Sequence, residues 1–157
     1  MINSQKKTIK WGIIGAGRIA RTFATDLQYA AHATLQGIAS RQADPAKAFA
    51  GEFSVPNYYG SYAAMLADPA IDAVYIATPH SHHRDQSIAA LNAGKHVLCE
   101  KPATVTGAEL EDVITVAKQQ GRYFMEGMWT YFMPVIEKTK RWVDEGRIGQ
   151  LCHVKAD

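Results

Sequence analysis

The residues Gly15-Ala16-Gly17-Arg18-Ile19-Ala20 follow the pattern G-x-G-x-x-A, between an apolar run at residues 9–14 and a segment with helical spacing of apolar residues. Gly15 permits a tight turn, Gly17 lets the backbone approach a pyrophosphate, and Ala20 keeps the helix close to the strand. The free N–H groups at the start of that helix favour phosphate oxygens. The alternative is a plain strand-to-helix turn, which two glycines serve equally well. In this context we expect a dinucleotide-binding turn formed by Gly15, Ala16, Gly17, Arg18 and Ile19.

Outward from this turn, short apolar runs alternate with segments of helical periodicity. The expected strands are residues 9–14, 35–39, 57–59, 73–77, 96–99 and 123–126. Between most of them, apolar residues recur three and four positions apart, which is typical of helices that pack on one face. Such alternation predicts parallel strands with helices on both faces of the sheet. The predicted fold class is therefore α/β, a Rossmann doubly wound parallel sheet.

Signals for helix starts place several boundaries. Asp44 is expected to cap a helix whose first residue is the following proline. Ser61 is expected to cap the next short helix, and Thr106 forms a capping box with Glu109. In the helix after the glycine turn, one apolar face is expected to contain Ile19, Phe23 and Leu27, with Ala20 and Ala24 beside them.

The C-terminal part of the sequence has a different pattern. Residues 134–145 have helical spacing, and two glycines follow them. Residues 151–157 alternate between apolar and polar side chains, which predicts a half-buried strand of a second, antiparallel sheet. A strand without a neighbour leaves its backbone groups unpaired. We therefore expect the front part of a longer protein, with a dinucleotide-binding domain at residues 1–128 and an incomplete second domain at residues 129–157.

Composition excludes several classes of protein. The 157 residues are 47% hydrophobic and 20% charged, which excludes intrinsic disorder, and the formal net charge is +2. No basic run is longer than Lys6-Lys7, so no nucleic-acid partner is expected. The polar N-terminus is unlike a signal peptide, and no apolar run approaches the roughly 18 residues of a membrane span. Cys99 and Cys152 lie in apolar stretches, where we expect buried thiols of a cytoplasmic protein.

The end of the second expected strand bears on the choice of cofactor. NAD sites place an acidic residue there to bind the ribose 2′-hydroxyl, but this sequence has Ser40 and Arg41. Ser40 can donate a hydrogen bond to a 2′-phosphate, and Arg41 can pair with it or stack on adenine. This predicts NADP(H), with NAD(H) as the alternative. A solvated loop charge at Arg41, or Asp44 as a substitute acid, would remove that preference.

Glu100-Lys101-Pro102 follows the fifth expected strand. Ligands of open α/β sheets bind outside the carboxyl ends of the strands, so Lys101 is expected to point toward the ligand crevice. There its ammonium could orient a substrate hydroxyl and stabilise a developing alkoxide. Pro102 would fix the backbone, for which a cis peptide bond is one way. The alternative is an ordinary surface lysine at the start of a loop.

Three stretches of the sequence together resemble one family. They are residues 15–20, the segment Thr78-Pro79-His80-Ser81-His82-His83, and the string Ala90-Leu91-Asn92-Ala93-Gly94-Lys95-His96-Val97-Leu98-Cys99-Glu100-Lys101-Pro102. They are similar to the glucose-fructose oxidoreductase, inositol dehydrogenase and MocA family (Gfo/Idh/MocA). Residues 125–130, Met-Glu-Gly-Met-Trp-Thr, further resemble its branch of dimeric dihydrodiol dehydrogenases and NADP-dependent D-xylose dehydrogenases.

The resemblance implies roles for particular residues. Lys101 would contact the substrate and the catalytic acid or base, and both Glu100 and Lys101 of this motif are assigned to the cofactor site. The cofactor would also be lined by Thr78, Pro79 and His83, although His80 stands where the family usually has Asn. Trp129 would border the nicotinamide and the substrate. The resemblance also implies a second domain with a largely antiparallel sheet, which would carry the acid or base beyond Asp157 and the dimer contacts.

The histidines of the second stretch could also suggest a metal site. Only His80 and His83 could share a helix face, and no cysteine or carboxylate nearby completes a ligand set. No metal is therefore expected.

Three functions are compatible with these patterns. The first is an NADP(H)-dependent oxidoreductase that transfers a hydride between the nicotinamide and a carbinol carbon of a sugar, polyol or dihydrodiol, in a protein expected to be a homo-oligomer. The second is a dinucleotide sensor of the same family without turnover, against which the intact Lys101 argues. The third is a standalone binding module, against which the unpaired final strand argues. The residues that follow Asp157 would discriminate between the first two.

Overall fold

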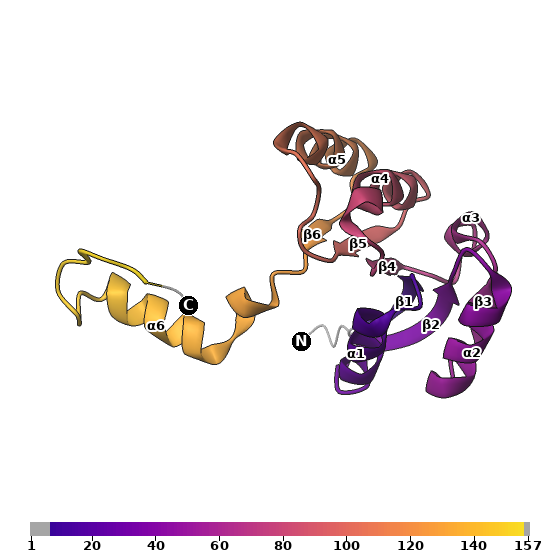
Figure 1. Ribbon diagram of the computed structural model, residues 1–157, viewed down its shortest axis with the longest axis horizontal. Helices are drawn as coiled ribbons and strands as arrows, with labels where there is room; N and C mark the ends of the chain where they lie inside the picture. The colour runs from indigo at the N-terminus through magenta and orange to yellow at the C-terminus, as the bar shows by residue number, and fades with distance from the viewer. Residues whose placement is uncertain (1–6, 156–157) are drawn as a thin grey trace, which may run out of the picture. The chain divides into compact units, whose positions relative to one another are not determined.

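A computed structural model describes residues 7–155 of the chain, and these residues fall into two compact units that divide after Gly127. The first unit contains one six-stranded sheet, in which every strand pair is parallel and the order is β3-β2-β1-β4-β5-β6 (Figure 1). Its strands are β1 (Ile9–Ile14), β2 (Ala33–Ala39), β3 (Asn57–Tyr59), β4 (Ala73–Ile76), β5 (His96–Cys99) and β6 (Phe124–Glu126). Its helices are α1 (Arg18–Leu27), α2 (Ala43–Phe53), α3 (Tyr62–Leu66), η1 (His80–His82), α4 (His83–Asn92) and α5 (Gly107–Gln120). The predicted doubly wound fold is confirmed, and each strand lies within two residues of its expected bounds.

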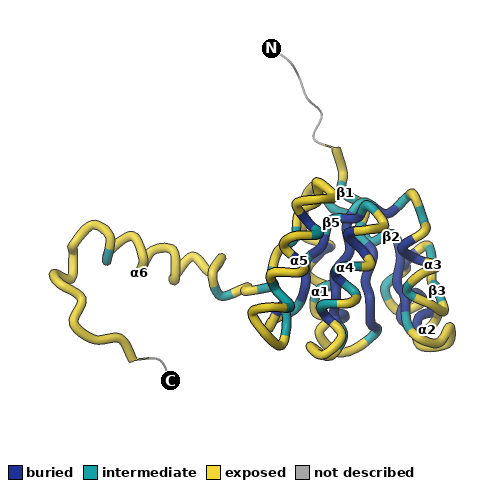
Figure 2. Tube along the Cα trace, turned by 90° about the horizontal axis from the view of Figure 1, so that it is seen from above, coloured by how far each residue is buried: buried dark blue, intermediate teal, exposed yellow. Residues whose placement is uncertain are grey.

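Helices cover both faces of the sheet because successive strand residues point to opposite sides. On one face, Ile14 and Ile76 pack with residues of α3, α4 and α5, among them Leu91 and Val113. On the other, Ile13, Ile38 and Tyr75 pack with α1 and α2. The strands consequently run through the buried centre of the unit, between helices whose outer sides are exposed (Figure 2).

The helix caps follow the sequence signals at two of three sites. Ser61 Oγ accepts from the Ala64 amide over 3.2 Å, and Thr106 Oγ1 accepts from the Glu109 amide over 3.3 Å. The prediction for Asp44 is wrong, because α2 starts at Ala43 and Asp44 lies in its first turn. The first-turn N–H groups of a helix have no intrahelical acceptor, so the proline after Asp44 is tolerated there as well as at the first position.

Helix α1 packs on the sheet through small residues. Ala20 and Ala24 are buried, together with Leu27, whereas the side chain of Ile19 is 42% exposed. The expected apolar face is thus rotated away from Ile19, because the two alanines let the helix backbone approach the strands closely.

A tyrosine–carboxylate hydrogen bond joins the end of β3 to the loop after α3. Tyr59 Oη donates to Asp68 Oδ2 over 2.5 Å. Burial and this carboxylate raise the pKa of Tyr59 to about 12, and the same bond, together with the Ala70 amide, lowers the pKa of Asp68.

We therefore expect alkali to destabilise the fold partly through Tyr59. The folded chain keeps the Tyr59 proton above pH 10.0, where an unfolded tyrosine loses it, so the free energy of unfolding should fall as pH rises from 10.0 to about 12. Tyr59→Phe should reduce that fall and cost about 1–2 kcal/mol at pH 7. Urea unfolding of both proteins at pH 7, 10 and 11 measures it, and equal pH slopes would contradict the assignment.

The second unit consists of η2 (Trp129–Phe132) and α6 (Pro134–Asp144), and α6 confirms the helix expected there. The strand expected at residues 151–157 is not formed at residues 151–155, which are exposed and irregular, while residues 156–157 lie outside the described range. A strand requires a neighbouring strand for its backbone groups, and the described part of this unit offers none. Because no strand forms at residues 151–155, Cys152 is exposed, contrary to expectation. Cys99 is buried as expected, and burial raises the pKa of its thiol to about 12.

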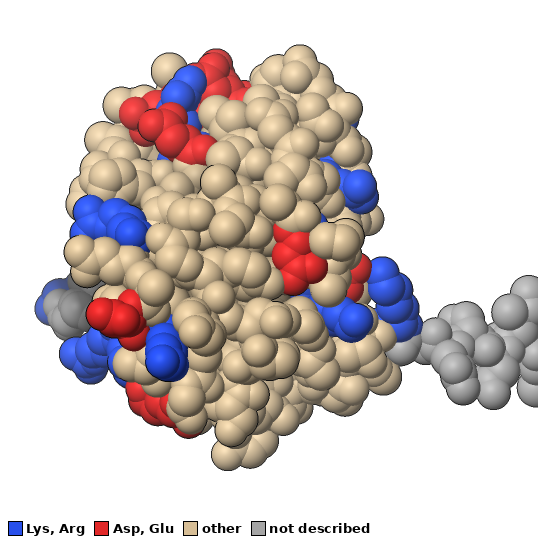
Figure 3. Space-filling model, turned by 90° about the vertical axis from the view of Figure 1, so that its right-hand side faces the viewer, with Lys and Arg blue, Asp and Glu red and all other residues tan. Residues whose placement is uncertain are grey.

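No helix in residues 7–155 combines the length and the apolar character that crossing a bilayer requires. On the face of the first unit seen in Figure 3, lysine and arginine side chains lie in several small groups, with acidic side chains near them and neutral surface between the groups.

Candidate functional site

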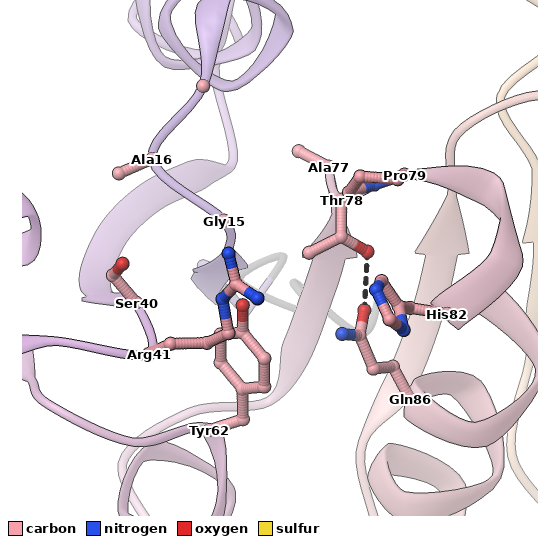
Figure 4. A pocket seen from close by; sticks show the side chains of 11 residues that line it. Gly15, Ala16, Ser40, Arg41, Tyr62, Ala77, Thr78, Pro79, His82 and Gln86 are labelled. Atoms are coloured by element: carbon pink, nitrogen blue, oxygen red, sulfur yellow. Dashed lines mark hydrogen bonds between the residues drawn. The ribbon is translucent and has the colours of Figure 1, made fainter.

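A pocket of about 290 Å³ lies where β1, β2 and β4 end and their loops begin. This is the carboxyl edge of the sheet, on both sides of the point where the strand order reverses between β1 and β4. The pocket is lined by Gly15, Ala16, Gly17, Ser40, Arg41, Tyr62, Ala77, Thr78, Pro79, His82 and Gln86 (Figure 4).

The two glycines of the turn have different structural roles. Gly15 has φ +98°, and a Cβ atom there would lie 3.0 Å from the Ala77 carbonyl oxygen, so only glycine fits. A Cβ atom at Gly17 would meet no heavy atom within 4 Å. Gly17 is also the N-cap residue of α1, so its surroundings are open where the unpaired helix amides begin. The open space beside Gly17 is therefore free for an anionic group such as a pyrophosphate.

Arg21, which was not predicted from the sequence, holds the glycine turn in place. Its guanidinium donates to the Ala16 carbonyl over 2.8 Å and to Glu52 over 3.0 Å. It lies three residues after Arg18, one helical turn further on, which is the spacing that could have pointed to it.

The side of the pocket at the end of β2 is basic and polar. Ser40 is half-buried and its amide donates to the Tyr59 carbonyl, which fixes the loop, while Arg41 is exposed. Burial raises the pKa of Tyr62, and the positive charge of Arg41, which lines the same pocket, opposes that rise. No carboxylate is among the residues that line the pocket.

The opposite wall comes from the loop after β4 and from α4. Thr78 Oγ1 donates to Gln86 Oε1 over 2.5 Å, as drawn in Figure 4. Gln86 and His82 were not predicted, although their spacing of four residues places them on one helical face. Tyr62 was also missed, because its place in the pocket depends on β3 lying beside β2.

His83, which the resemblance assigns to the cofactor site, is not among the residues that line the pocket. It is 1% exposed, and its ring nitrogens lie 2.8 Å from the carbonyl oxygens of Thr78 and Pro102. Its ring therefore connects the loop after β4 with the loop after β5, beneath the surface that a ligand could touch.

The Glu-Lys-Pro corner follows β5 directly. The Glu100 amide donates to the Ile76 carbonyl of β4 over 3.0 Å, and the Lys101–Pro102 peptide bond is cis, the arrangement considered from the sequence. Lys101 is exposed, and within residues 7–155 its ammonium has no hydrogen bond or ion pair. The backbone of this corner is thus held in place, whereas the Lys101 ammonium makes none of these contacts.

The structure brings together most of the predicted site residues, but not all of them. Seven line the pocket: Gly15, Ala16, Gly17, Ser40, Arg41, Thr78 and Pro79. Those outside its lining are Arg18, Ile19, His83, Glu100 and Lys101 in the first unit and Trp129 in the second. Of these, His83 is the one that is buried.

A parallel sheet of this strand order, with a glycine turn between β1 and α1 and a crevice at the switch point, defines a dinucleotide-binding domain. The family described as "Oxidoreductase family, NAD-binding Rossmann fold" matches residues 9–128. The chain belongs to this family, the Gfo/Idh/MocA oxidoreductases, and carries its NAD(P)-binding domain.

Relatives with curated names include two dehydrogenases of the expected branch. The chain is 37% identical over 151 residues to trans-1,2-dihydrobenzene-1,2-diol dehydrogenase of Bos taurus and 36% identical over 170 residues to D-xylose 1-dehydrogenase (NADP(+)) of Hypocrea jecorina. These matches cover 95% and 100% of this chain but 45% and 43% of the relatives, so the chain spans less than half their length.

Solved structures show the same fold with either cofactor. Scyllo-inositol dehydrogenase from Lactobacillus casei, with bound NAD(H) and scyllo-inositol, is 34% identical with a TM-score of 0.84, covering 92% of this chain and 43% of that one. A mutant 3-ketoreductase from Actinomadura kijaniata, in complex with TDP-benzene and NADP, is 33% identical with a TM-score of 0.86, covering 92% and 46%. The fold alone therefore does not select between NAD and NADP.

Proposed function

We propose that this chain is the NADP(H)-binding part of a dehydrogenase that acts on a carbinol carbon of a sugar, polyol or dihydrodiol. The observation that carries the proposal is the pocket at the switch point, with open space at Gly17 and with Ser40 and Arg41 in place of an acid. The names of the relatives, a dihydrodiol, a xylose and an inositol dehydrogenase, support the substrate class. Residues 129–157 would begin the second domain, and the longer protein would be a homo-oligomer.

The arrangement of the pocket residues would place the adenosine half and the nicotinamide half of the dinucleotide on opposite sides of the glycine turn. The turn at Gly15–Gly17 and the first amides of α1 would hold the pyrophosphate. Ser40 and Arg41 would bind the 2′-phosphate of the adenosine half, where a carboxylate would repel it. Thr78 and Pro79 lie on the wall formed by the loop after β4, next to β5, and would bind the nicotinamide half.

When bound, the nicotinamide gives or accepts the hydride. The part assigned to this chain is orientation: Lys101 would hold the substrate oxygen by a charge-assisted hydrogen bond as negative charge develops on it. The proton donor or acceptor would come from the second domain. If the longer protein binds NADP(H) but no sugar, polyol or diol is turned over, the alternative of a cofactor-binding sensor is favoured.

The choice of cofactor can be tested at Arg41. We expect Arg41→Ala to weaken NADP(H) binding by about 1–3 kcal/mol, the scale of a charge-assisted contact, while NAD(H) binding changes little. Titration of the 157-residue chain with both reduced cofactors, followed by nicotinamide fluorescence, gives the two dissociation constants. An equal loss of affinity for NADP(H) and NAD(H) would show that Arg41 does not bind the 2′-phosphate.

A further inference from the structure

One carboxylate connects a buried tyrosine of β4 to the Glu-Lys-Pro corner. Tyr75 Oη donates to Glu100 Oε1 over 2.5 Å, and Glu100 Oε2 accepts from the Lys101 backbone amide over 3.1 Å. Because each oxygen has its own partner, rotation of the carboxylate would weaken both hydrogen bonds. The orientation of Glu100 is therefore coupled to the backbone of Lys101.

Tyr75 is held rigidly, so it can impose that orientation. Its side chain is 3% exposed, and its ring stacks on Phe23 of α1 with centroids 3.9 Å apart and planes 18° apart. Burial, with a smaller contribution from Glu100, raises the pKa of Tyr75 far above its usual value, so the hydroxyl stays a donor near neutral pH. A neutral donor on a packed ring can therefore hold the Glu100 carboxylate in one orientation.

Lys101 itself has little else to hold it. Its side chain is exposed, and the hydrogen bond from its amide is made to Glu100. The Glu100 amide is anchored to the Ile76 carbonyl of β4 over 3.0 Å, so one strand supplies both the backbone and the side-chain restraint. The direction in which the Lys101 side chain leaves the corner depends on this pair of contacts.

We propose that Tyr75 is a positioning residue, which acts through the Glu100 carboxylate to hold the Lys101 backbone in one orientation. The consequence for hydride transfer rests on the function proposed above, whereas the mechanical link from Tyr75 to Lys101 does not. Removing the hydroxyl would free the carboxylate to rotate, without emptying the space that the ring fills.

The link can be measured without turnover. Tyr75→Phe keeps the ring and its stacking on Phe23, and we expect the Lys101 amide to exchange with solvent about tenfold faster, as for the loss of one net hydrogen bond. Solvent-exchange NMR on the 157-residue chain at pH 7 reads this amide directly. The matched control is Tyr59→Phe, which removes another 2.5 Å tyrosine–carboxylate bond, to Asp68, and should leave the Lys101 amide unchanged.

A second variant, Glu100→Ala, distinguishes positioning by Tyr75 from a general loosening of the corner after β5. Glu100→Ala alone should speed exchange at Lys101 by a similar factor, and adding Tyr75→Phe to it should have no further effect. An unchanged rate in Tyr75→Phe, or additive effects in the double variant, would overturn the proposal. In the unsubstituted chain, the Tyr75 hydroxyl proton should give a far-downfield resonance with a cross-peak to Glu100; its absence would overturn the proposal even if Tyr75→Phe did not fold.

NADPH titration of the same samples tests the proposed function separately. If the chain fails to bind NADPH while Lys101 exchange responds to Tyr75→Phe, the function is wrong and the positioning link stands. If NADPH binds but Lys101 exchange does not respond to Tyr75→Phe, the positioning link is wrong and the proposed function stands.

Discussion

Gly17→Val should abolish most cofactor binding while the fold survives. The open space around Gly17, with no heavy atom within 4 Å of an added Cβ, is where the pyrophosphate would lie, and φ is −82°, which valine accepts. The isopropyl group would keep phosphate oxygens away from the first amides of α1. Losing two charge-assisted hydrogen bonds of about 1.5 kcal/mol each corresponds to roughly 100-fold in affinity, for NADP(H) and NAD(H) alike.

Two other glycines serve as controls for this experiment. Gly107→Val also places valine at the start of a helix, with no heavy atom near the added Cβ, but on α5 away from the pocket lining, and it should leave cofactor binding intact. Gly15→Ala should instead destabilise the fold, because of the positive φ and the approach to the Ala77 carbonyl. Fluorescence titration and thermal unfolding are measured on all three. Normal dinucleotide binding by the Gly17→Val protein would show that the cofactor lies elsewhere.

The sheet could be predicted from the sequence because its strands are short and buried on both faces. Residues 73–76 are apolar throughout and the structure buries all four, so no helical periodicity competes with the assignment. The glycine turn was equally predictable, since its spacing reflects backbone geometry rather than distant contacts. The strand predicted at 151–157 is not formed in its described residues 151–155, because alternation indicates a strand only when a neighbouring strand is present.

Contacts between loops of different strands could not be predicted in this way. Tyr62 enters the pocket because β3 pairs with β2, and Tyr75 reaches Glu100 because β4 pairs with β5. His83 and Lys95 illustrate the same limit, because polar residues are usually exposed, yet both are buried here. The carbonyl oxygens of Thr78 and Pro102 lie 2.8 Å from the ring nitrogens of His83, and those of Asp68 and Ile71 accept hydrogen bonds from the Lys95 ammonium.

If the pocket holds NADP(H) as proposed, the largest effect on turnover should come from Lys101→Ala in a protein that includes the second domain. An ammonium that steadies the substrate oxygen acts mainly where negative charge develops, so its loss should lower kcat by about 10²–10³. Affinity for NADP(H) should change little, because Lys101 lies outside the lining of the pocket at the glycine turn. Lys118→Ala, a surface substitution on α5, is the matched control and should leave both quantities unchanged.

The 157-residue chain makes this experiment informative about which part of the reaction depends on the second domain proposed above. It contains the glycine turn, Arg41 and Thr78, so it should bind NADP(H), yet without a proton donor or acceptor from the second domain it should not turn over substrate. Steady-state assays and cofactor titrations on both lengths of protein, each with and without Lys101→Ala, give the full comparison. Turnover by the short chain at the rate of the long one would place the whole active site within residues 1–157. An unchanged kcat for Lys101→Ala in the longer protein would reduce Lys101 to a structural residue of the corner after β5.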